Sequence, residues 1–390
     1  MTTIGYQWNG RVQGLSCLRC RQRYSPSDAV ADLGVGCVSC LEQGYPVSLR
    51  VDYEHEQDWR PQSAASGMMR YAAQLPYIDF PTLGEGATPL VELPTLAQSL
   101  GIKRLWVKNE GQNPTGSHKD RMSALAVARA ASLGRKTVVA ASSGNAGASL
   151  AAYAAAAKMR CVIISTANIS PVWERAIRMA GAELILTDTP KERWQIMRQR
   201  VEQEGWYPVT NYLNPPTGSN PFGVQGYKTV AYEIVEQCAG EMPTVVIIPT
   251  ARGDLLWGIW QGFLETGHSK LPRLVAVEPC VRLSSVLVGE DYRQSFAGEP
   301  HAMSSIGGTT ATYQSMVALR DSQGMAVEVS TTETEEAQQA LARLGLYTEL
   351  SAAAALSGLR TLLREGQIAA SDRVILVITS HGYKELPAQG

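Results

Sequence analysis

The chain has 390 residues, 45% of them hydrophobic and 18% charged, with a formal net charge of −1; this is enough for a sizeable core divided among two or three domains. The near-neutral balance gives no electrostatic basis for binding nucleic acid or a membrane surface, and no uninterrupted apolar run reaches transmembrane length. The first residues lack the apolar core of a secretion signal, so we expect a cytoplasmic protein.

Four of the seven cysteines form two CxxC pairs near the N-terminus, Cys17 with Cys20 and Cys37 with Cys40. Sixteen residues separate the pairs, a spacing typical of a zinc ribbon in which four thiolates surround one zinc ion. We predict a zinc-ribbon-like segment over residues 1–50 that packs against the rest of the chain. Four reduced thiols left by an ancestral site are the alternative. Nucleic-acid binding is disfavoured because acidic residues interrupt the basic ones.

Seven short runs rich in β-branched and apolar residues predict strands, with helical stretches between most of them. The runs are 104–108, 137–141, 160–165, 183–187, 244–249, 273–278 and 373–379. A further helix is expected around 68–74. This alternation predicts a mainly parallel α/β fold.

Residues 113–121 read NPTGSHKDR and place Lys119 at an expected junction between a loop and a helix. A lysine amine that is partly desolvated and held beside polar groups can lose its proton and form a Schiff base with an aldehyde cofactor. Pyridoxal phosphate (PLP) is the obvious aldehyde. A lone SxK segment would ordinarily be a solvated helix start, but three further segments favour a cofactor site.

The first of these segments follows the expected strand 137–141 and contains Ser142, Ser143, Gly144 and Asn145. Loops at the carboxyl ends of strands in open α/β sheets are where ligands bind. Its glycines let backbone amides approach an anion or a ring oxygen, and the Asn145 amide suits a pyridine hydroxyl. An ordinary capped turn is the alternative.

The second segment is a loop between the expected strand 244–249 and a following helix. Such a loop can hold a phosphate on amide donors and the helix dipole, and an arginine in it can add a charged contact. Because its turn has only one glycine, the signal is weak alone. The loop residues are Thr250, Ala251, Arg252, Gly253, Asp254 and Leu255.

The third segment ends the strand 373–379 with Thr379 and continues to Gly382. A neutral hydroxyl facing a pyridine nitrogen leaves that nitrogen largely unprotonated, which tunes how far the ring acts as an electron sink. By itself the segment would more often be an ordinary strand end.

Together and in this order, the segments resemble threonine synthase and its relatives among the fold type II PLP-dependent enzymes of the tryptophan synthase β superfamily. Residues 83–90, LGEGATPL, are similar to that family's LGEGxTPL, and 113–121 to its NPTGSFKDR. Residues 142–147 are similar to SSGN(A/T)(A/G), 349–355 to EPxSAAA and 379–382 to TGHG. The segment 226–229 with its following helix is also similar. The resemblance runs from about residue 80 to the end.

The resemblance implies two open, mainly parallel α/β domains. A large PLP-binding domain would comprise 51–119 and 221–390, and a small mobile domain 120–220. It further implies a homodimer, and some relatives carry a similar cysteine-paired N-terminal segment. No membrane or nucleic-acid partner is expected.

The resemblance also assigns site residues. Lys119 would form the Schiff base, Asn145 would contact the ring hydroxyl and Thr379 would lie near the pyridine nitrogen. Residues 250–255 would hold the cofactor phosphate. Near the amino-acid substrate we expect Ser117, Ser142, Ser143 and Gly144.

Three departures from the family pattern fall in this pocket. His118 stands where phenylalanine is usual, either as a second acid or base or as a neutral ring with one hydrogen bond. Ala251 and Asp254 occupy two glycine positions of a loop that usually reads PVGNAGN. Gly223 replaces the arginine of a segment like NPYRIEG, and Gln225 its glutamate, which would fit a substrate without a phosphate.

The implied activity is elimination or replacement on an amino acid, with Lys119 as the general base after the substrate amine displaces it. The threonine synthase reaction converts O-phosphohomoserine and water into threonine and phosphate. The alternatives are β-elimination from serine, threonine or diaminopropionate, β-replacement on phosphoserine, and a non-catalytic PLP-binding regulatory protein.

Overall fold

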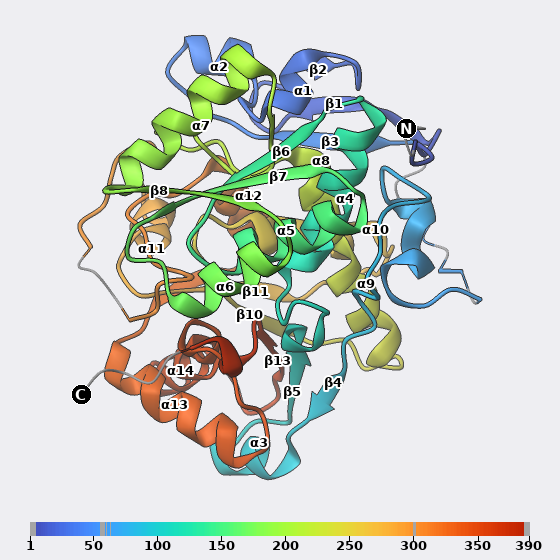
Figure 1. Ribbon diagram of the computed structural model, residues 1–390. Coiled ribbons are helices and arrows are strands. Elements are labelled where there is room, and N and C mark those ends of the chain that lie inside the picture. The colour runs from blue at the N-terminus through green and yellow to red at the C-terminus, as the bar shows by residue number, and fades with distance from the viewer. Residues whose placement is uncertain (1–4, 55–58, 60, 63, 299–301, 386–390) are drawn as a thin grey trace.

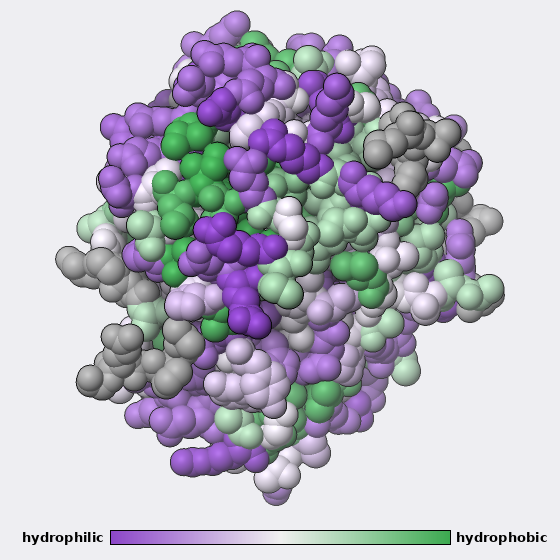
Figure 2. All heavy atoms as spheres, viewed as in Figure 1, coloured by the Kyte–Doolittle hydropathy of each residue, from purple (hydrophilic) through white to green (hydrophobic). Residues whose placement is uncertain are grey.

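The computed structural model describes residues 5–54, 59, 61–62, 64–298 and 302–385 and builds them around three sheets (Figure 1). Within these residues, no helix combines the length and apolarity needed to cross a membrane. The face in Figure 2 is mostly hydrophilic, with apolar side chains gathered over the edge strand β8 (Glu183–Thr187), where Leu186 is 44% exposed.

The largest sheet has six strands in the order β12-β11-β10-β13-β5-β4, and all neighbours are parallel except the antiparallel pair β4 and β5. Its strands read as continuous apolar runs because helices cover both faces. The strands are β4 (Leu90–Glu92), β5 (Arg104–Asn109), β10 (Val245–Pro249), β11 (Arg273–Glu278), β12 (Met325–Glu328) and β13 (Arg373–Ile378).

Alternate residues of these strands enter two different cores. Val245 and Ile247 of β10 pack with α3 (Pro94–Leu100), α13 (Thr331–Arg343) and α14 (Leu350–Arg364). Val246 and Ile248 face the opposite side, which is covered by α9 (Lys228–Gln237), α10 (Asp254–Glu265) and α12 (Tyr313–Asp321). The short helices α8 (Pro221–Val224) and α11 (Leu283–Leu287) complete this part of the chain.

A second, all-parallel sheet has the strand order β8-β7-β6-β9. One face packs on α4 (Lys119–Ser132), α5 (Asn145–Ala156) and α6 (Pro171–Met179), and the other on α7 (Pro190–Glu204). Its remaining strands are β6 (Thr137–Ala141), β7 (Arg160–Thr166) and β9 (Tyr207–Pro208). The carboxyl ends of β5, β6, β10 and β13 carry the loops singled out in the sequence.

The N-terminal segment forms a third, antiparallel sheet in the order β2-β1-β3, with two short helices, at the top of the view in Figure 1. Its elements are β1 (Val12–Cys17), β2 (Arg23–Tyr24), β3 (Leu49–Tyr53), α1 (Ala29–Leu33) and α2 (Val38–Glu42). The segment packs on α4, because Arg129 Nε of that helix lies 2.8 Å from Asp32 Oδ1.

The seven predicted strands are all present, each with ends within one residue of the expected ones. The expected helix near residue 70 is a 3-10 helix, Gly67–Gln74. The edge strands β4, β9 and β12 and the ribbon strands were not anticipated. The domain boundaries at 119/120 and 220/221 stay a prediction, and residues 386–390 of the predicted large domain lie outside the described residues.

Candidate active site

Lys119 is the first residue of α4, and buried polar contacts fix the loop that leads to it. The backbone N–H of Thr115 donates to Asp120 Oδ2 at 2.7 Å. Arg121, fully buried, pairs with Glu110 at 2.7 Å and with Glu233 at 2.6 Å. Burial would raise the pKa of Glu233, but the charges and hydrogen bonds of Arg121 and Lys108 together outweigh burial and lower it to about 2. Such a network is costly to disturb, so it holds the start of α4 in place.

The amine of Lys119 is held in an environment that weakens its charge. The side chain is half-buried, and its Nζ lies 3.5 Å from the hydroxyl oxygen of Tyr227. Burial, aided by the positive charge of Arg252, lowers the pKa of Lys119 to about 8 although Asp254 and Glu349 oppose the shift. About a tenth of the amine is then neutral at pH 7, against less than about one part in a thousand for an ordinary lysine.

His118 is a buried, neutral ring beside this amine. Its Nδ1 lies 3.1 Å from the Thr379 carbonyl oxygen, which also accepts from the His118 backbone N–H at 3.0 Å. Since a carbonyl only accepts, Nδ1 carries the proton. Burial and the nearby Lys119 charge hold the pKa of His118 well below its usual value. The geometry matches the second of the two expectations, a neutral ring with one hydrogen bond, and the catalytic role stays untested.

The side-chain hydroxyl of Ser117 makes no hydrogen bond within the described part of the chain. The residue pairs through the backbone with Ser380, which brings it beside the end of β13. Its Oγ is buried and has no hydrogen-bond partner among the described residues. Because buried polar atoms are nearly always satisfied in folded proteins, this hydroxyl is placed to meet a ligand.

Asn145, the first residue of α5, is held from two sides. Its Nδ2 donates to Glu349 Oε2 at 2.9 Å, and its Oδ1 accepts from Lys384 Nζ at 2.7 Å. Glu349 also accepts from the Ser380 hydroxyl. Burial lowers the pKa of Lys384 to about 8 although Glu349 and Asp120 oppose the shift. The loop before α5 therefore lies against the end of β13.

Within that loop, Ser142 is buried and Gly144 half-buried, while Ser143 is exposed. Ser142 Oγ accepts from the backbone N–H groups of Gly144 at 3.3 Å and Gly147 at 3.0 Å. These contacts turn the chain tightly into the N-terminus of α5, where the helix dipole favours an anion.

The loop 250–253 connects β10 to α10 and needs its single glycine. Gly253 has φ +81°, and a Cβ there would collide with Ser315. The carboxylate of Asp254 accepts from the backbone N–H of Ser219 at 3.0 Å, from the Ser219 hydroxyl at 2.7 Å and from Gln314 Nε2 at 2.5 Å. Its oxygens are thus bound by neutral donors, which explains how an acidic residue is tolerated in this loop.

The glycine that replaces the family arginine, Gly223, is closely packed. An ideal Cβ on Gly223 would lie 3.0 Å from Met122 Cγ and 3.2 Å from the Met122 carbonyl oxygen. Gln225 is engaged on both sides, accepting from Tyr53 at 3.1 Å and donating to Gln261 at 3.4 Å. A side chain at position 223 would therefore require Met122 and its neighbours to move by a few tenths of an ångström.

The residues that converge here fit an aldehyde cofactor with a phosphate. Lys119 supplies an amine that is readily neutral, Ser117 an unpaired hydroxyl, and the N-terminus of α10 an anion-binding end. Thr379 and Asn145 are both buried, and the Thr379 carbonyl oxygen accepts from the backbone N–H of His118, next to Lys119. Within the loop 250–255, Thr250 and Leu255 are buried and Ala251 and Arg252 half-buried.

Three neighbours of the site were missed by sequence reasoning: Tyr227, Glu349 and Lys384. The first two lie inside segments that were matched to the family, 226–229 and 349–355, but no role was assigned to them. Lys384 follows the 379–382 motif by two residues. Their contacts with Lys119 and Asn145 span 108 or more positions along the chain, so only the tertiary fold reveals them.

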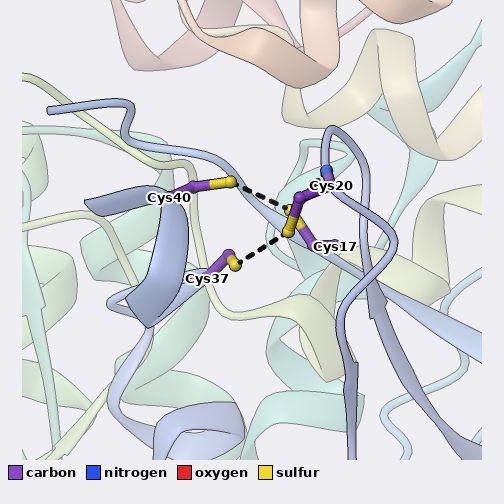
Figure 3. A group of neighbouring side chains, drawn as sticks. All are labelled: Cys17, Cys20, Cys37 and Cys40. Atoms are coloured by element: carbon purple, nitrogen blue, oxygen red, sulfur yellow. Dashed lines mark hydrogen bonds between the residues drawn. The ribbon is translucent and has the colours of Figure 1, made fainter. Parts of the chain in front are cut away.

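The four paired cysteines converge on a separate site in the N-terminal segment (Figure 3). Their sulfur atoms all lie within 4.8 Å of one another, with Cys17 and Cys40 at 3.7 Å and Cys20 and Cys37 at 3.6 Å. A zinc ion with bonds of about 2.3 Å to four sulfurs in a tetrahedron places the sulfurs about 3.8 Å apart. The cluster therefore has the dimensions of a zinc tetrathiolate.

Comparisons with known proteins show the family to which this chain is related. The family model described as "Pyridoxal-phosphate dependent enzyme" matches residues 81–380. Threonine synthase of Methanocaldococcus jannaschii is 32% identical over 386 residues, covering 95% of this chain and 92% of the relative. Threonine synthase of Halalkalibacterium halodurans is 33% identical over 313 residues, covering 78% and 84%.

Solved structures show the same fold at lower identity. O-ureido-L-serine synthase superposes with a TM-score of 0.64 at 24% identity, covering 77% of this chain and 91% of that one. Diaminopropionate ammonia lyase from Escherichia coli gives a TM-score of 0.67 at 21% identity, covering 77% and 85%. These likenesses show that the architecture, with two open α/β sheets, is that of fold type II enzymes.

Proposed function

Because this chain belongs to the family of pyridoxal-phosphate dependent enzymes, we propose that it is a threonine synthase-type lyase that converts O-phospho-L-homoserine and water into threonine and phosphate. The observation that carries the proposal is the 32% identity with a threonine synthase over 95% of the chain. The amine of Lys119, with a pKa of about 8, supplies the matching chemistry.

When bound, PLP supplies an electron sink for negative charge at the substrate Cα. Lys119 is the base that takes the Cα proton and returns protons along the substrate chain, a task suited to an amine with a pKa near neutrality. Asn145 and Thr379 would hold the ring. Amide groups at the start of α10 would hold the cofactor phosphate.

The substrate carboxylate would bind near Ser117 and the loop 142–144. The unpartnered Ser117 hydroxyl and the N-terminal end of α5 both favour an anion there. Holding the Cα–H bond in a fixed direction relative to Lys119 Nζ is the main contribution of these contacts.

A second candidate, a β-eliminating lyase or β-replacing synthase, is favoured by one observation. Gly223, which packs against Met122, brings no cation to the position of the family arginine. A substrate such as serine, threonine or diaminopropionate needs no cation for a side-chain phosphate.

One experiment separates these candidates. The purified holoenzyme is mixed in separate reactions with O-phospho-L-homoserine, serine, threonine and diaminopropionate. Visible absorption, released phosphate and released ammonia are measured in each reaction, with Lys119→Ala as the control. Phosphate release with threonine formation supports the synthase. Ammonia release from serine, threonine or diaminopropionate without phosphate release supports the lyase. Absence of Cα-proton exchange in deuterated water with any of these amino acids identifies a non-catalytic PLP-binding protein.

The proposal includes a cytoplasmic homodimer, as the relationship to threonine synthases suggests. Light scattering of the purified holoenzyme would measure its mass, and a mass near twice 42.2 kDa supports the dimer.

A further inference from the structure

A lysine near the end of the chain reaches the loop proposed to hold the substrate carboxylate. Lys384 ends the short 3-10 helix Gly382–Lys384 that follows β13, and its Nζ lies 2.7 Å from Asn145 Oδ1 at the start of α5. We propose that Lys384 is the cation that binds the α-carboxylate of the amino-acid substrate. The inference rests on the proposed function and adds a charged residue to its substrate subsite.

The ammonium group of Lys384 lies between two parts of the fold that surround this subsite. On one side is the turn before α4. An ideal Cβ on Gly116, the residue before Ser117, would lie 2.7 Å from Lys384 Cε and 3.1 Å from Lys384 Nζ. On the other side is the Trp173 ring of α6, whose centre is 4.9 Å from Nζ. The absence of a side chain at Gly116 therefore leaves the space in which the lysine side chain lies.

The same tryptophan ring connects the ammonium group to the loop before α5. Cε2 and Nε1 of Trp173 each lie 3.7 Å from the place of a Cβ on Gly144. Gly144 and Lys384 therefore contact the same ring, and the next residue, Asn145, is bonded to Lys384 directly. A carboxylate that binds at the start of α5 is within reach of this cation.

The protein leaves most of the hydrogen-bonding capacity of this ammonium group free. An ammonium has three N–H donors, and the acceptor that Lys384 has among the described residues is the neutral amide of Asn145. No carboxylate in the described part of the chain forms an ion pair with it. The carboxylates whose charges reach it are Glu349 and Asp120. Glu349 accepts from Asn145 Nδ2 at 2.9 Å, and Asp120 accepts from the backbone N–H of Thr115 at 2.7 Å.

Lys384 is half-buried and still carries its charge at neutral pH. Burial lowers the pKa of Lys384 to about 8, so roughly nine-tenths of the amine is protonated at pH 7. A charge that is withdrawn from water and left without a counter-ion raises the free energy of the folded protein. A bound carboxylate would supply that counter-ion.

A second group beside the lysine also lacks a partner. Ser117 follows Gly116 in the chain and is fully buried, and its Oγ has no acceptor or donor among the described residues. The first N–H groups of α5 have no acceptor within their own helix. A carboxylate has two oxygens that can accept from several donors at once. The cation, the hydroxyl and the helix N-terminus together match this ligand.

The place of the cation favours the α-carboxylate over a phosphate on the substrate side chain. The carboxylate is bonded to Cα, the atom from which Lys119 takes the proton, so its subsite has to adjoin that lysine. Lys384 packs on Gly116, which precedes Lys119 by less than one turn of chain. The phosphate of O-phospho-L-homoserine is separated from Cα by two carbon atoms and an oxygen, so it lies farther from Lys119.

The test compares amino acids with their carboxamides, in which a neutral amide replaces the carboxylate. Holoenzyme saturated with PLP is titrated with L-threonine or L-threoninamide, and with L-serine or L-serinamide, while visible absorption is followed. We expect wild type to bind the acids more tightly than the amides. Lys384→Met should weaken binding of the acids roughly 10- to 100-fold, the size expected from losing a charge-assisted contact, and should change binding of the amides less than about twofold.

Two further variants serve as controls. Lys384→Arg keeps the positive charge and should lose less affinity for the acids than Lys384→Met. Lys191→Met removes an equal charge from an exposed position in the first turn of α7, and it should bind acids and amides like wild type.

Three results would overturn the proposal: wild type that binds the acids no more tightly than the amides, unchanged binding of the acids by Lys384→Met, and an equal loss for acids and amides in that variant. The last result would mean that Lys384 acts only by orienting Asn145. The proposed function fails separately. If wild type releases no phosphate from O-phospho-L-homoserine while its preference for the acids depends on Lys384, the function is wrong and the carboxylate contact stands. Phosphate release with an unchanged KM in Lys384→Met rejects the contact and keeps the function.

Discussion

The Nζ atom of Lys384 lies 2.7 Å from the Oδ1 atom of Asn145. The lysine is confined, with its Cε 2.7 Å from the place of a Cβ on Gly116 and its Nζ 4.9 Å from the centre of the Trp173 ring. Because Glu349 accepts from the other end of the same amide, a cation and a carboxylate together set which way Asn145 faces.

Replacing Lys384 should therefore weaken the cofactor site without removing its lysine. We expect Lys384→Met to lower PLP affinity roughly 10-fold, the typical cost of one charge-assisted hydrogen bond, when apoenzyme is titrated and visible absorption followed. Lys384→Arg, which keeps the charge, should lose less. Wild-type affinity in Lys384→Met would show that Asn145 is oriented by other contacts.

His118→Phe should leave the pH profile of kcat unchanged between pH 6 and 9, because burial keeps the imidazole neutral throughout that range. The Thr379 carbonyl keeps its bond from the residue 118 backbone N–H in this variant, so the stability cost should stay below about 1 kcal/mol. Steady-state rates across the range measure this. A limb of the profile that moves in the variant would give His118 a catalytic role.

The same substitution should reduce the loss of stability in acid. The pKa of folded His118 lies below the unfolded value of about 6.5, so the unfolded chain binds a proton that the folded chain does not. This histidine therefore costs stability as pH falls below about 6.5 and costs none above it. The melting temperature of His118→Phe should fall less steeply than that of wild type between pH 6.5 and 5.

The cysteine cluster should hold metal in the purified protein. We expect about one zinc ion per chain by elemental analysis and less than about a tenth of that in Cys37→Ser, because a structural site needs all four thiolates. Loss of zinc should make residues 5–54 more sensitive to protease. Contacts such as that of Arg129 with Asp32 would still hold the segment to α4, but the metal would no longer hold its cysteines together. Cys161→Ser, at an isolated buried cysteine, is the control and should keep the metal. Equal zinc in both variants would place the ion elsewhere.

Local sequence pattern was enough to predict most of the fold. Strands such as β6 and β11 are buried on both faces, so their apolar runs stop where the sheet stops, and the predicted ends match. The edge strands β4, β9 and β12 have two to four residues, too few for any periodicity to emerge. Their pairing depends on neighbours brought in by the fold.

The candidate site also has features that the sequence predicted and features that depend on the fold. Lys119 and the loops that surround it follow from motifs, because each motif is a continuous piece of chain. The charge state of Lys119 cannot be predicted from a motif, because it is set by burial and by Arg252, Asp254 and Glu349 from distant segments. The close packing at Gly223 likewise depends on Met122, about a hundred positions away. The sequence thus predicted which segments lie near Lys119 and not which distant residues change its pKa.

The tuning of Lys119 leads to a last prediction about cofactor attachment. Only a neutral amine attacks an aldehyde, so the rate at which apoenzyme takes up PLP should rise with pH and level off above about 8. Asp254 opposes the lowering of the pKa of Lys119, so Asp254→Asn should move the midpoint of the pH–rate curve below 8. The lowered pKa also affects stability. The folded amine has a lower pKa than the unfolded one, so the free energy of unfolding of the apoenzyme rises with pH between about 8 and about 10.4. Stopped-flow absorption between pH 6 and 10 gives the midpoints, and Asp254→Glu, which keeps the charge, is the control. The same midpoint in wild type and Asp254→Asn would mean that Asp254 is screened by its bonds to Ser219 and Gln314 and does not change the reactivity of Lys119.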